Sequence, residues 1–141
     1  MKRERLTKKI SFGHGKTMPW PAVLDDFDYF SSVNPQYEPM RQLVYDLHSC
    51  AATDLHATQT MGGNLLLSPE EQLQMDDNVL LISYRPKEQL FHFEHRTISK
   101  MDDSKNASIS EAWDTLRLFI GYKFGLRLPE MRPKFVSLKM P

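Results

Sequence analysis

The residues with the clearest potential for acid–base chemistry lie on one expected strand, residues 90–95. His92 and Glu94 are two positions apart, so they face the same side of that strand, where they can orient each other as a general acid–base pair requires. A further imidazole, His56, follows Asp54 in another strand-like stretch. One hypothesis is therefore a small enzyme or ligand-binding domain, with a pocket on the open face of a sheet around His56, His92 and Glu94.

Other catalytic motifs are missing from the sequence. It contains no serine in a nucleophile elbow, no glycine-rich phosphate loop and no metalloprotease helix motif. The pair Gly62-Gly63 would let a ligand approach the backbone closely, but a turn or a bulge explains it more simply. The enzyme therefore stays the alternative hypothesis, behind a protein that acts by binding.

Metal-ligating residue types occur without the spacing of a metal site. His48, Cys50 and His56 follow the pattern H-x-C-x5-H, which matches no well-formed zinc site, and a fourth ligand is not evident nearby. The acidic stretch 25–28 lacks the glycine and the distal glutamate of a calcium loop. We expect no metal and no cofactor. Because Cys50 is the single cysteine, no internal disulfide can form, and a reducing compartment is indicated.

The formal net charge of zero conceals an uneven distribution. Residues 1–16 carry six basic side chains and one acidic one, residues 17–103 carry five and fourteen, and residues 104–141 carry seven and three. The basic ends either neutralise the acidic middle internally or leave it free to attract a basic partner. The acidic residues expected outside the apolar helix faces are the candidate partner-binding residues: Asp25, Asp26, Asp28, Glu70, Glu71, Asp76 and Asp77.

The length and composition are those of one globular domain. The chain has 141 residues, of which 40% are hydrophobic and 26% charged. No apolar run is long enough to span a bilayer, and the basic N-terminus is not followed by the apolar core of a signal peptide, so a cytoplasmic location without membrane contact is expected. Residues 1–20 form a basic arm or an edge strand, and residues 21–141 the domain. The arm contains Glu4 and lacks interleaved aromatic residues, so nucleic-acid binding is disfavoured.

Two long amphipathic helices are predicted. In residues 108–125 an apolar stripe runs at helical spacing, with a capping pattern at Ser108 and Glu111 and a left-handed cap at Gly125, while Thr115 is expected to face water. A second stripe, over residues 40–51, leaves Asp46 outside it. The members of the first stripe are Ala112, Trp113, Leu116, Phe119, Ile120 and Phe124.

The strands come between these helices. Residues 79–84 and 90–95 predict a hairpin, and 53–67 predicts either a second hairpin or one bent strand around Gly62-Gly63. A turn is expected over residues 25–30, a short helix from Ser68-Pro69, a polar turn over 101–107 and edge strands near both ends, at 6–12 and 135–140. The predicted fold is α+β, a single-layer antiparallel sheet of three to five strands with two long helices packed on one face.

The order of these segments resembles small bacterial toxin-immunity proteins. The resemblance covers residues 38–125 and rests on the helix Met40–Leu47, the strand Asn64–Ser68, the hairpin Asn78–His95 and the final helix from Ser110. Immunity proteins neutralise a toxin by binding it and catalyse nothing, so the resemblance implies a protein partner, with the acidic middle fitting a basic toxin. A homo-oligomer is a further possibility, because tyrosines such as Tyr29, Tyr37 and Tyr122 would suit an interface.

Overall fold

The computed structural model describes residues 17–50, 55–60, 62–71, 78–97 and 100–133 of the chain. Within these residues the helices are α1 (Trp20–Val33), α2 (Glu38–Cys50) and α3 (Ala112–Phe119), and α3 continues as a π-helical turn, Ile120–Phe124. The strands are β1 (His56–Thr60), β2 (Asn64–Ser68), β3 (Val79–Arg85), β4 (Leu90–Thr97) and β5 (Lys100–Ser108). Short 3-10 turns, Pro35–Tyr37 and Ile109–Glu111, precede α2 and α3.

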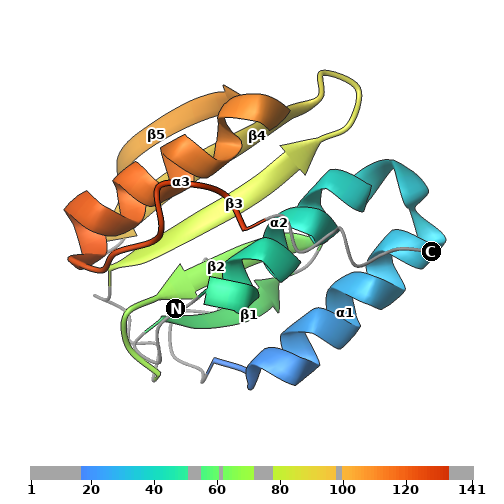
Figure 1. Ribbon diagram of the computed structural model, residues 1–141, viewed down its shortest axis with the longest axis horizontal. Helices are drawn as coiled ribbons and strands as arrows, with labels where there is room; N and C mark the ends of the chain where they lie inside the picture. The colour runs from blue at the N-terminus through green and yellow to red at the C-terminus, as the bar shows by residue number, and fades with distance from the viewer. Residues whose placement is uncertain (1–16, 51–54, 61, 72–77, 98–99, 134–141) are drawn as a thin grey trace, which may run out of the picture.

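The five strands form one antiparallel sheet in the order β1-β2-β3-β4-β5, so each strand lies beside its neighbours in the chain (Figure 1). The turn between β1 and β2 contains Gly62 and Gly63, both with positive φ, which decides between the two predicted possibilities in favour of a hairpin. The predicted hairpin of β3 and β4 is also present. The predicted α+β class with a single antiparallel sheet is confirmed.

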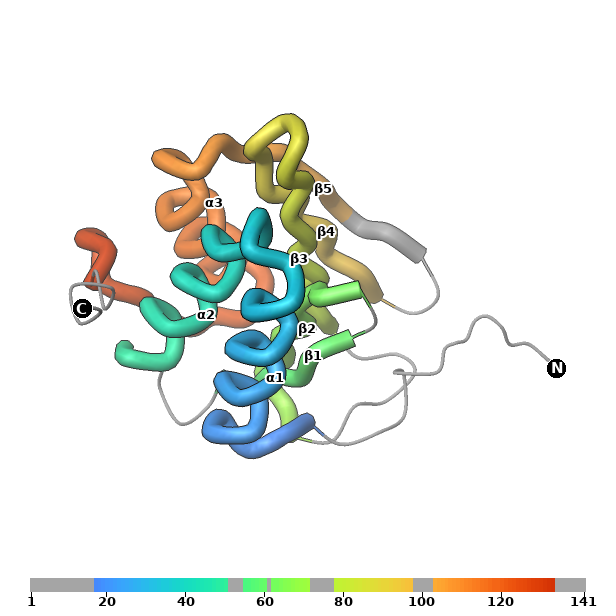
Figure 2. Tube along the Cα trace, turned by 90° about the vertical axis from the view of Figure 1, so that its right-hand side faces the viewer, coloured from blue at the N-terminus to red at the C-terminus, as the bar shows by residue number. Residues whose placement is uncertain are grey.

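The three described helices cover one face of the sheet, and none of them lies on the other face (Figure 2). Phe91 and Phe93 of β4 point into the helix-covered face and are fully buried, whereas His92 and Glu94 alternate with them on the open face, as predicted. Phe93 stacks against Phe119 of α3, with 6.0 Å between the ring centroids. The main core therefore lies between the helices and the sheet.

The predicted C-terminal helix is present, with a different beginning. Its apolar stripe packs into the core, and Gly125 adopts the predicted left-handed cap with φ of 71°. The predicted capping pattern is wrong: Ser108 makes no capping bond, and the chain enters α3 through a 3-10 turn. Thr115, predicted to face water, is buried as well. The buried surface of α3 is therefore wider than the apolar pattern indicates.

The predicted turn over residues 25–30 is wrong, because these residues lie within α1. Pro21 lies in the first turn of this helix, where backbone amides have no hydrogen-bond partner within the helix, so its missing amide hydrogen costs little. Val23, Phe27 and Ser31 recur every four residues and are the buried positions of α1. This stripe is narrow and ends in a polar residue. The neighbouring aspartates and prolines are typical of turns, and they therefore obscure the helical pattern in the sequence.

The predicted polar turn over residues 101–107 is also wrong, since these residues form β5. This strand lies at the edge of the sheet and pairs with β4 along its length, with an irregularity between His95 and Arg96. Ala107 is buried there, while residues 103–106 are exposed. A strand that packs little apolar surface has no need of hydrophobic alternation, and its sequence resembles that of a loop.

The predicted helix from Ser68-Pro69 does not begin as expected. Ser68 ends β2, and its hydroxyl accepts a hydrogen bond of 3.0 Å from the amide of Glu70, within bends over residues 69–71. The remainder of that prediction falls on residues 72–77, outside the described residues. The same is true of the predicted edge strands at 6–12 and 135–140 and of residues 1–16 of the predicted arm.

Candidate functional site

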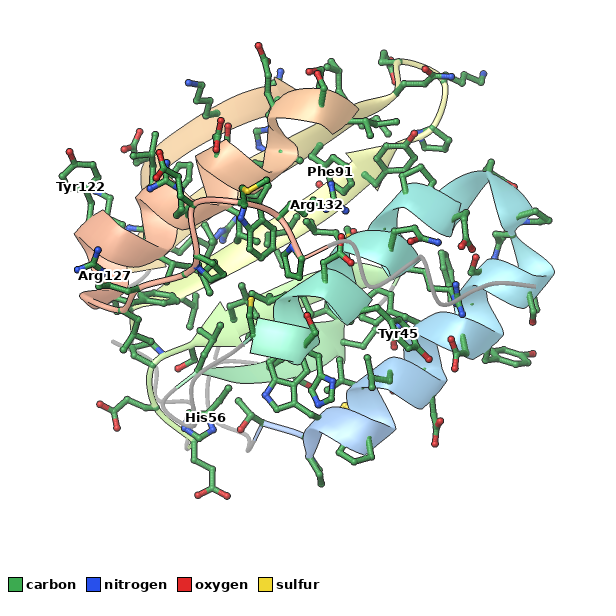
Figure 3. The ribbon with its side chains drawn as sticks, viewed as in Figure 1. Tyr45, His56, Phe91, Tyr122, Arg127 and Arg132 are labelled. Atoms are coloured by element: carbon green, nitrogen blue, oxygen red, sulfur yellow. The ribbon has the colours of Figure 1, made fainter. Side chains whose placement is uncertain are left out.

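The predicted pocket residues share the open face of the sheet, but they do not converge. His92 contacts Glu94, with 3.5 Å between Nε2 and Oε1, and its Nδ1 lies 2.7 Å from Oδ1 of Asn106. Glu94 also pairs with Arg96. His56 lies on β1, three strands away from β4, which corresponds to about 14 Å at the usual strand spacing. Figure 3 shows His56 at the opposite end of the sheet from the β3–β4 loop.

The network of His92, Glu94, Arg96 and Asn106 links two strands on the open sheet face. Each of its side chains already has a partner within the network. A catalytic pair must direct one of its groups at a substrate held in a concave site, and none of these four residues lines the groove described below. These side chains therefore give no support to the hypothesis of an enzyme.

Of the predicted partner-binding residues, Asp28 is engaged within the fold. Its carboxylate accepts hydrogen bonds from Arg41, at 2.8 Å, and from the hydroxyl of Tyr45, at 2.7 Å, so it joins α1 to α2. Burial, together with the hydrogen bond to Asp28, raises the pKa of Tyr45 to about 12. Asp28 therefore contributes first of all to the packing of α1 on α2.

Glu38 completes this contact between the two helices. Its carboxylate accepts hydrogen bonds from Ser31 of α1 and from Arg41 and Gln42 of α2. Burial alone would raise the pKa of Glu38, but these hydrogen bonds and the charge of Arg41 outweigh burial and lower it. The acidic residues at the α1–α2 contact are thus internally compensated, which separates them from those on the outer side of α1.

The outer side of α1 combines acidic and apolar residues. Asp25 is exposed, and Tyr29 and Val33, at steps of four residues, are 72% and 58% exposed. Asp26, next to Asp25, is half-buried. The helix contains no lysine or arginine. We call Asp25, Asp26, Tyr29 and Val33 the acidic face of α1.

The other predicted acidic residues lie near the start of this helix or outside the described residues. Glu70 and Glu71 are exposed, and the carbonyl oxygen of Glu71 accepts hydrogen bonds from the amide and the hydroxyl of Thr17, both at 3.0 Å. Because Thr17 precedes α1 by three residues, Glu70 and Glu71 extend the acidic character towards its N-terminal end. Asp76 and Asp77 lie outside the described residues.

The described C-terminal segment, residues 126–133, crosses the helix layer from the end of α3 towards α2, and we call it the strap (Figure 1). Leu128 is buried in the core, and the indole Nε1 of Trp113 donates a hydrogen bond of 2.9 Å to the carbonyl oxygen of Pro129. Arg132 pairs with Asp46 of α2 (Figure 3). The prediction that Asp46 lies outside the buried stripe is wrong, because it is only 2% exposed and serves as the anchor of the strap.

An open groove of about 900 Å³ lies between the strap, the start of α3 and the β3–β4 loop. Trp113 and Leu90 contribute its apolar lining, and Met131 of the strap is 82% exposed at its side. Three carboxylates from three separate segments also line it: Glu88, Asp114 and Glu130. We call this feature the strap groove. Sequence reasoning did not find it, since its acidic residues are far apart in the chain and follow no motif.

A second polar network is buried beside the end of α3. His95 lies in the core and contacts Oδ1 of Asn78, whose amide group donates a hydrogen bond of 2.7 Å to the carbonyl oxygen of Lys123. Because Asn78 donates to Lys123, its Oδ1 accepts, and Nε2 of His95 carries the proton. The ring of Phe124 lies 6.4 Å from that of His95. This network joins the sheet to the helix layer, which indicates a structural role.

The described residues offer no cluster of three side chains suited to hold a metal ion. His48 packs against Trp20, with 5.4 Å between ring centroids, and the thiol of Cys50 contacts the carbonyl oxygen of Asp46. Burial and the nearby charge of Asp46 raise the pKa of Cys50, so its reactive thiolate form is disfavoured. In the described part of the chain, no helix is both long enough and apolar enough to span a membrane.

The acidic face of α1 and the strap groove are thus the two surface features whose composition suits recognition. The first is a helix side carrying an exposed tyrosine, and the second is concave and has an acidic border. No protein-family model matches this chain, and no curated protein sequence or solved structure matches it.

Proposed function

We propose that this protein is a non-catalytic binding module that neutralises a basic protein partner, as an immunity protein inhibits its cognate toxin in the bacterial cytoplasm. The observation that carries the proposal is the acidic face of α1. It places an exposed tyrosine and an exposed valine beside two aspartates, on a helix without a basic residue. Tyrosine is enriched at protein interfaces, and carboxylates attract a basic partner over long distances.

The contrast between Asp25 and Asp28 supports this assignment. Asp28 is held by Arg41 and Tyr45, so its charge is largely compensated within the fold. Asp25 lies on the outer side of the same helix and is exposed. α1 therefore packs through one side and offers the carboxylate of Asp25 to a partner on the other side, next to the aromatic ring of Tyr29.

The test is affinity capture from the source organism with the wild-type chain, followed by association kinetics with the captured protein. The double reversal Asp25→Lys and Asp26→Lys should slow association by about tenfold at low salt, with a much smaller difference at high salt. The Tyr29→Ala variant should mainly accelerate dissociation, because it removes a packed aromatic contact rather than a charge.

The matched control reverses two exposed acidic residues elsewhere, Asp103→Lys and Glu111→Lys, which changes the net charge equally. Circular dichroism establishes that each variant is folded. Equal slowing by both double variants would show that only net charge matters and would contradict a site on α1. Capture of a basic protein whose toxic activity the wild-type chain does not reduce would contradict the inhibitory role.

A further inference from the structure

We propose that the strap groove binds an extended basic segment of a partner protein, with lysine or arginine side chains placed between apolar ones. The groove is formed by three segments that meet only in the fold: the β3–β4 loop, residues 108–114 and the strap. Its volume of about 900 Å³ falls within the range of about 300–1,000 Å³ that is usual for ligand sites. The inference extends the proposed function, because it names a second contact and the chemistry of what fills it.

The charge of the groove selects a cationic occupant. Glu88, Asp114 and Glu130 each bring a carboxylate from a different segment. Among the lining residues, all in the described part of the chain, Arg132 is the one basic side chain, and its guanidinium is already paired with Asp46. The Asp114 carboxylate, 70% exposed, lies 3.8 Å from Arg117, a separation at which an exposed ion pair is weak. The groove therefore presents uncompensated negative charge.

The apolar lining favours an occupant that carries apolar groups beside its positive charges. Trp113 is 4% exposed at the base of the groove, and Ile109 and Met131 expose apolar surface beside it. Aromatic residues and methionine are enriched at protein interfaces, and the aliphatic stem of a lysine or arginine packs well on such surfaces. The hydroxyls of Ser108 and Ser110 form a hydrogen bond of 3.2 Å with each other, and their remaining lone pairs can accept from the backbone amides of a bound segment.

The arrangement does not suit a metal ion or a nucleic acid. The three carboxylates border the groove from separate segments, and within the described residues they form no ligand cluster. Nucleic acid would bring phosphate charges of the same sign. An extended peptide can contact all three segments at once and can meet both the acidic and the apolar lining residues.

The indole groups of Trp20 and Trp113 provide an internal comparison for the test. Trp113 donates to Pro129 of the strap, whereas Trp20 donates to the carbonyl oxygen of Leu55, near β1. The ¹⁵N-labelled full chain gives one indole signal for each tryptophan, and the Trp20→Phe variant assigns them. The probe is the acetylated, amidated pentapeptide Leu-Lys-Leu-Arg-Leu, compared with Leu-Gln-Leu-Gln-Leu.

The basic peptide should shift the Trp113 signal in a saturable, salt-sensitive manner and leave the Trp20 signal in place. The triple variant Glu88→Gln, Asp114→Asn and Glu130→Gln should weaken binding by about tenfold, from three carboxylate contacts of modest strength each. The control variant, Asp103→Asn with Glu111→Gln, removes exposed acidic residues outside the lining and should bind as the wild type does.

Several results would overturn the inference. They are an unmoved Trp113 signal, equal binding of the neutral peptide, and equal weakening by the control variant. Broadening of the Trp113 signal with protein concentration alone, lost in the triple variant, would assign the groove to a second copy of this chain. The double reversal of Asp25 and Asp26 distinguishes the inference from the proposed function. This variant disables the α1 site alone, so it should lose partner capture and keep peptide binding. The triple variant should lose peptide binding and keep partner capture.

Discussion

The guanidinium of Arg132 pairs with the carboxylate of Asp46 and thereby ties the strap to α2, 86 positions earlier in the chain. Asp46 is almost completely buried, and the side chain of Arg132 is 19% exposed. A carboxylate taken out of water needs such a partner, since its desolvation is otherwise uncompensated. The ion pair therefore acts together with buried Leu128 and the hydrogen bond from Trp113 to Pro129 to hold the strap in place beside the groove.

Removing the positive charge of the strap should destabilise the protein. Arg132→Gln leaves the buried Asp46 without its guanidinium partner, and we expect the free energy of unfolding to fall by about 2–4 kcal/mol. Urea denaturation monitored by tryptophan fluorescence measures the change. Arg127→Gln, at an exposed position of the same strap, should change stability by less than about 0.5 kcal/mol. Equal effects of the two substitutions would show that the ion pair contributes nothing specific.

The β1–β2 turn offers a matched pair of glycines. Both have positive φ, 82° for Gly62 and 78° for Gly63, so alanine at either position costs about 1 kcal/mol in backbone strain. A Cβ on Gly63 would also lie 2.3 Å from the ring of Phe30, whereas one on Gly62 would meet nothing within 4 Å. We expect Gly63→Ala to cost about 1–3 kcal/mol more than Gly62→Ala.

Thermal unfolding of both glycine variants checks this expectation, with the double substitution Gly63→Ala and Phe30→Leu as the control. Replacing the ring of Phe30 by the smaller leucine side chain should recover part of the stability lost in Gly63→Ala, because it relieves the clash. If Gly63→Ala loses no more stability than Gly62→Ala, the ring of Phe30 moves aside freely, and α1 is not packed tightly on this turn.

The sequence predicted the elements that bury one continuous apolar face. α2, α3 and the β3–β4 hairpin each carry a clear stripe or alternation, and the choice of Phe91 and Phe93 as core residues is correct. The two missed elements bury fewer apolar side chains: Val23 and Phe27 in α1 and, among the described side chains of β5, Ala107. Their backbone conformation depends on neighbouring segments more than on their own pattern, which explains why the sequence alone did not show it.

The candidate site was predictable by residue type and not by placement. Asp25 is exposed and Asp26 is half-buried, while Asp28 lies in the same acidic run and is bound by Arg41. The helical period of α1 separates them, and that helix was not foreseen. The strap groove depends on residues 88, 114 and 130 meeting in space, for which no local pattern exists.

The hydrogen bond between Tyr45 and Asp28 makes stability depend on alkaline pH. The pKa of Tyr45 is raised by burial and by Asp28 to about 12 in the folded state, above its ordinary value of 10.0. Between these values the unfolded chain has already lost a proton that the folded chain keeps, so this contribution is complete below about pH 10 and is lost as pH rises towards 12. Tyr45→Phe should therefore weaken the decline of stability over that interval.

Tyrosinate absorbance, taken as the difference between wild type and Tyr45→Phe, measures the titration directly. Asp28→Asn should shift the titration of Tyr45 towards lower pH, because the neutral amide no longer opposes the phenolate charge. Tyr122 is exposed and points away from the fold (Figure 3), so Tyr122→Phe is the control and should leave the pH dependence of stability unchanged. A Tyr45 that titrates at the ordinary value would contradict the interhelical hydrogen bond.

The last prediction concerns self-association through the edge strand β5. Among the described residues no strand pairs with its outer edge, which makes it a possible template for a second copy. Asp103 and Lys105 lie opposite His95 and Phe93, so they share the helix-covered face, and Asp103 pairs with Lys123 at 3.8 Å. Charged residues at an edge strand oppose strand-to-strand docking, since pairing would desolvate them.

We therefore expect the wild-type chain to sediment as a monomer, and the variant Asp103→Val with Lys105→Val to associate with increasing concentration. The matched control, Ser104→Val with Asn106→Val, adds the same β-branched residues to the same strand on the opposite face and keeps the charges of Asp103 and Lys105. Association of both variants would assign the effect to β-propensity instead of charge. If the wild-type chain is a dimer, and the double valine variant does not strengthen it, the charges of Asp103 and Lys105 do not prevent association through β5. An interface elsewhere then joins the two copies.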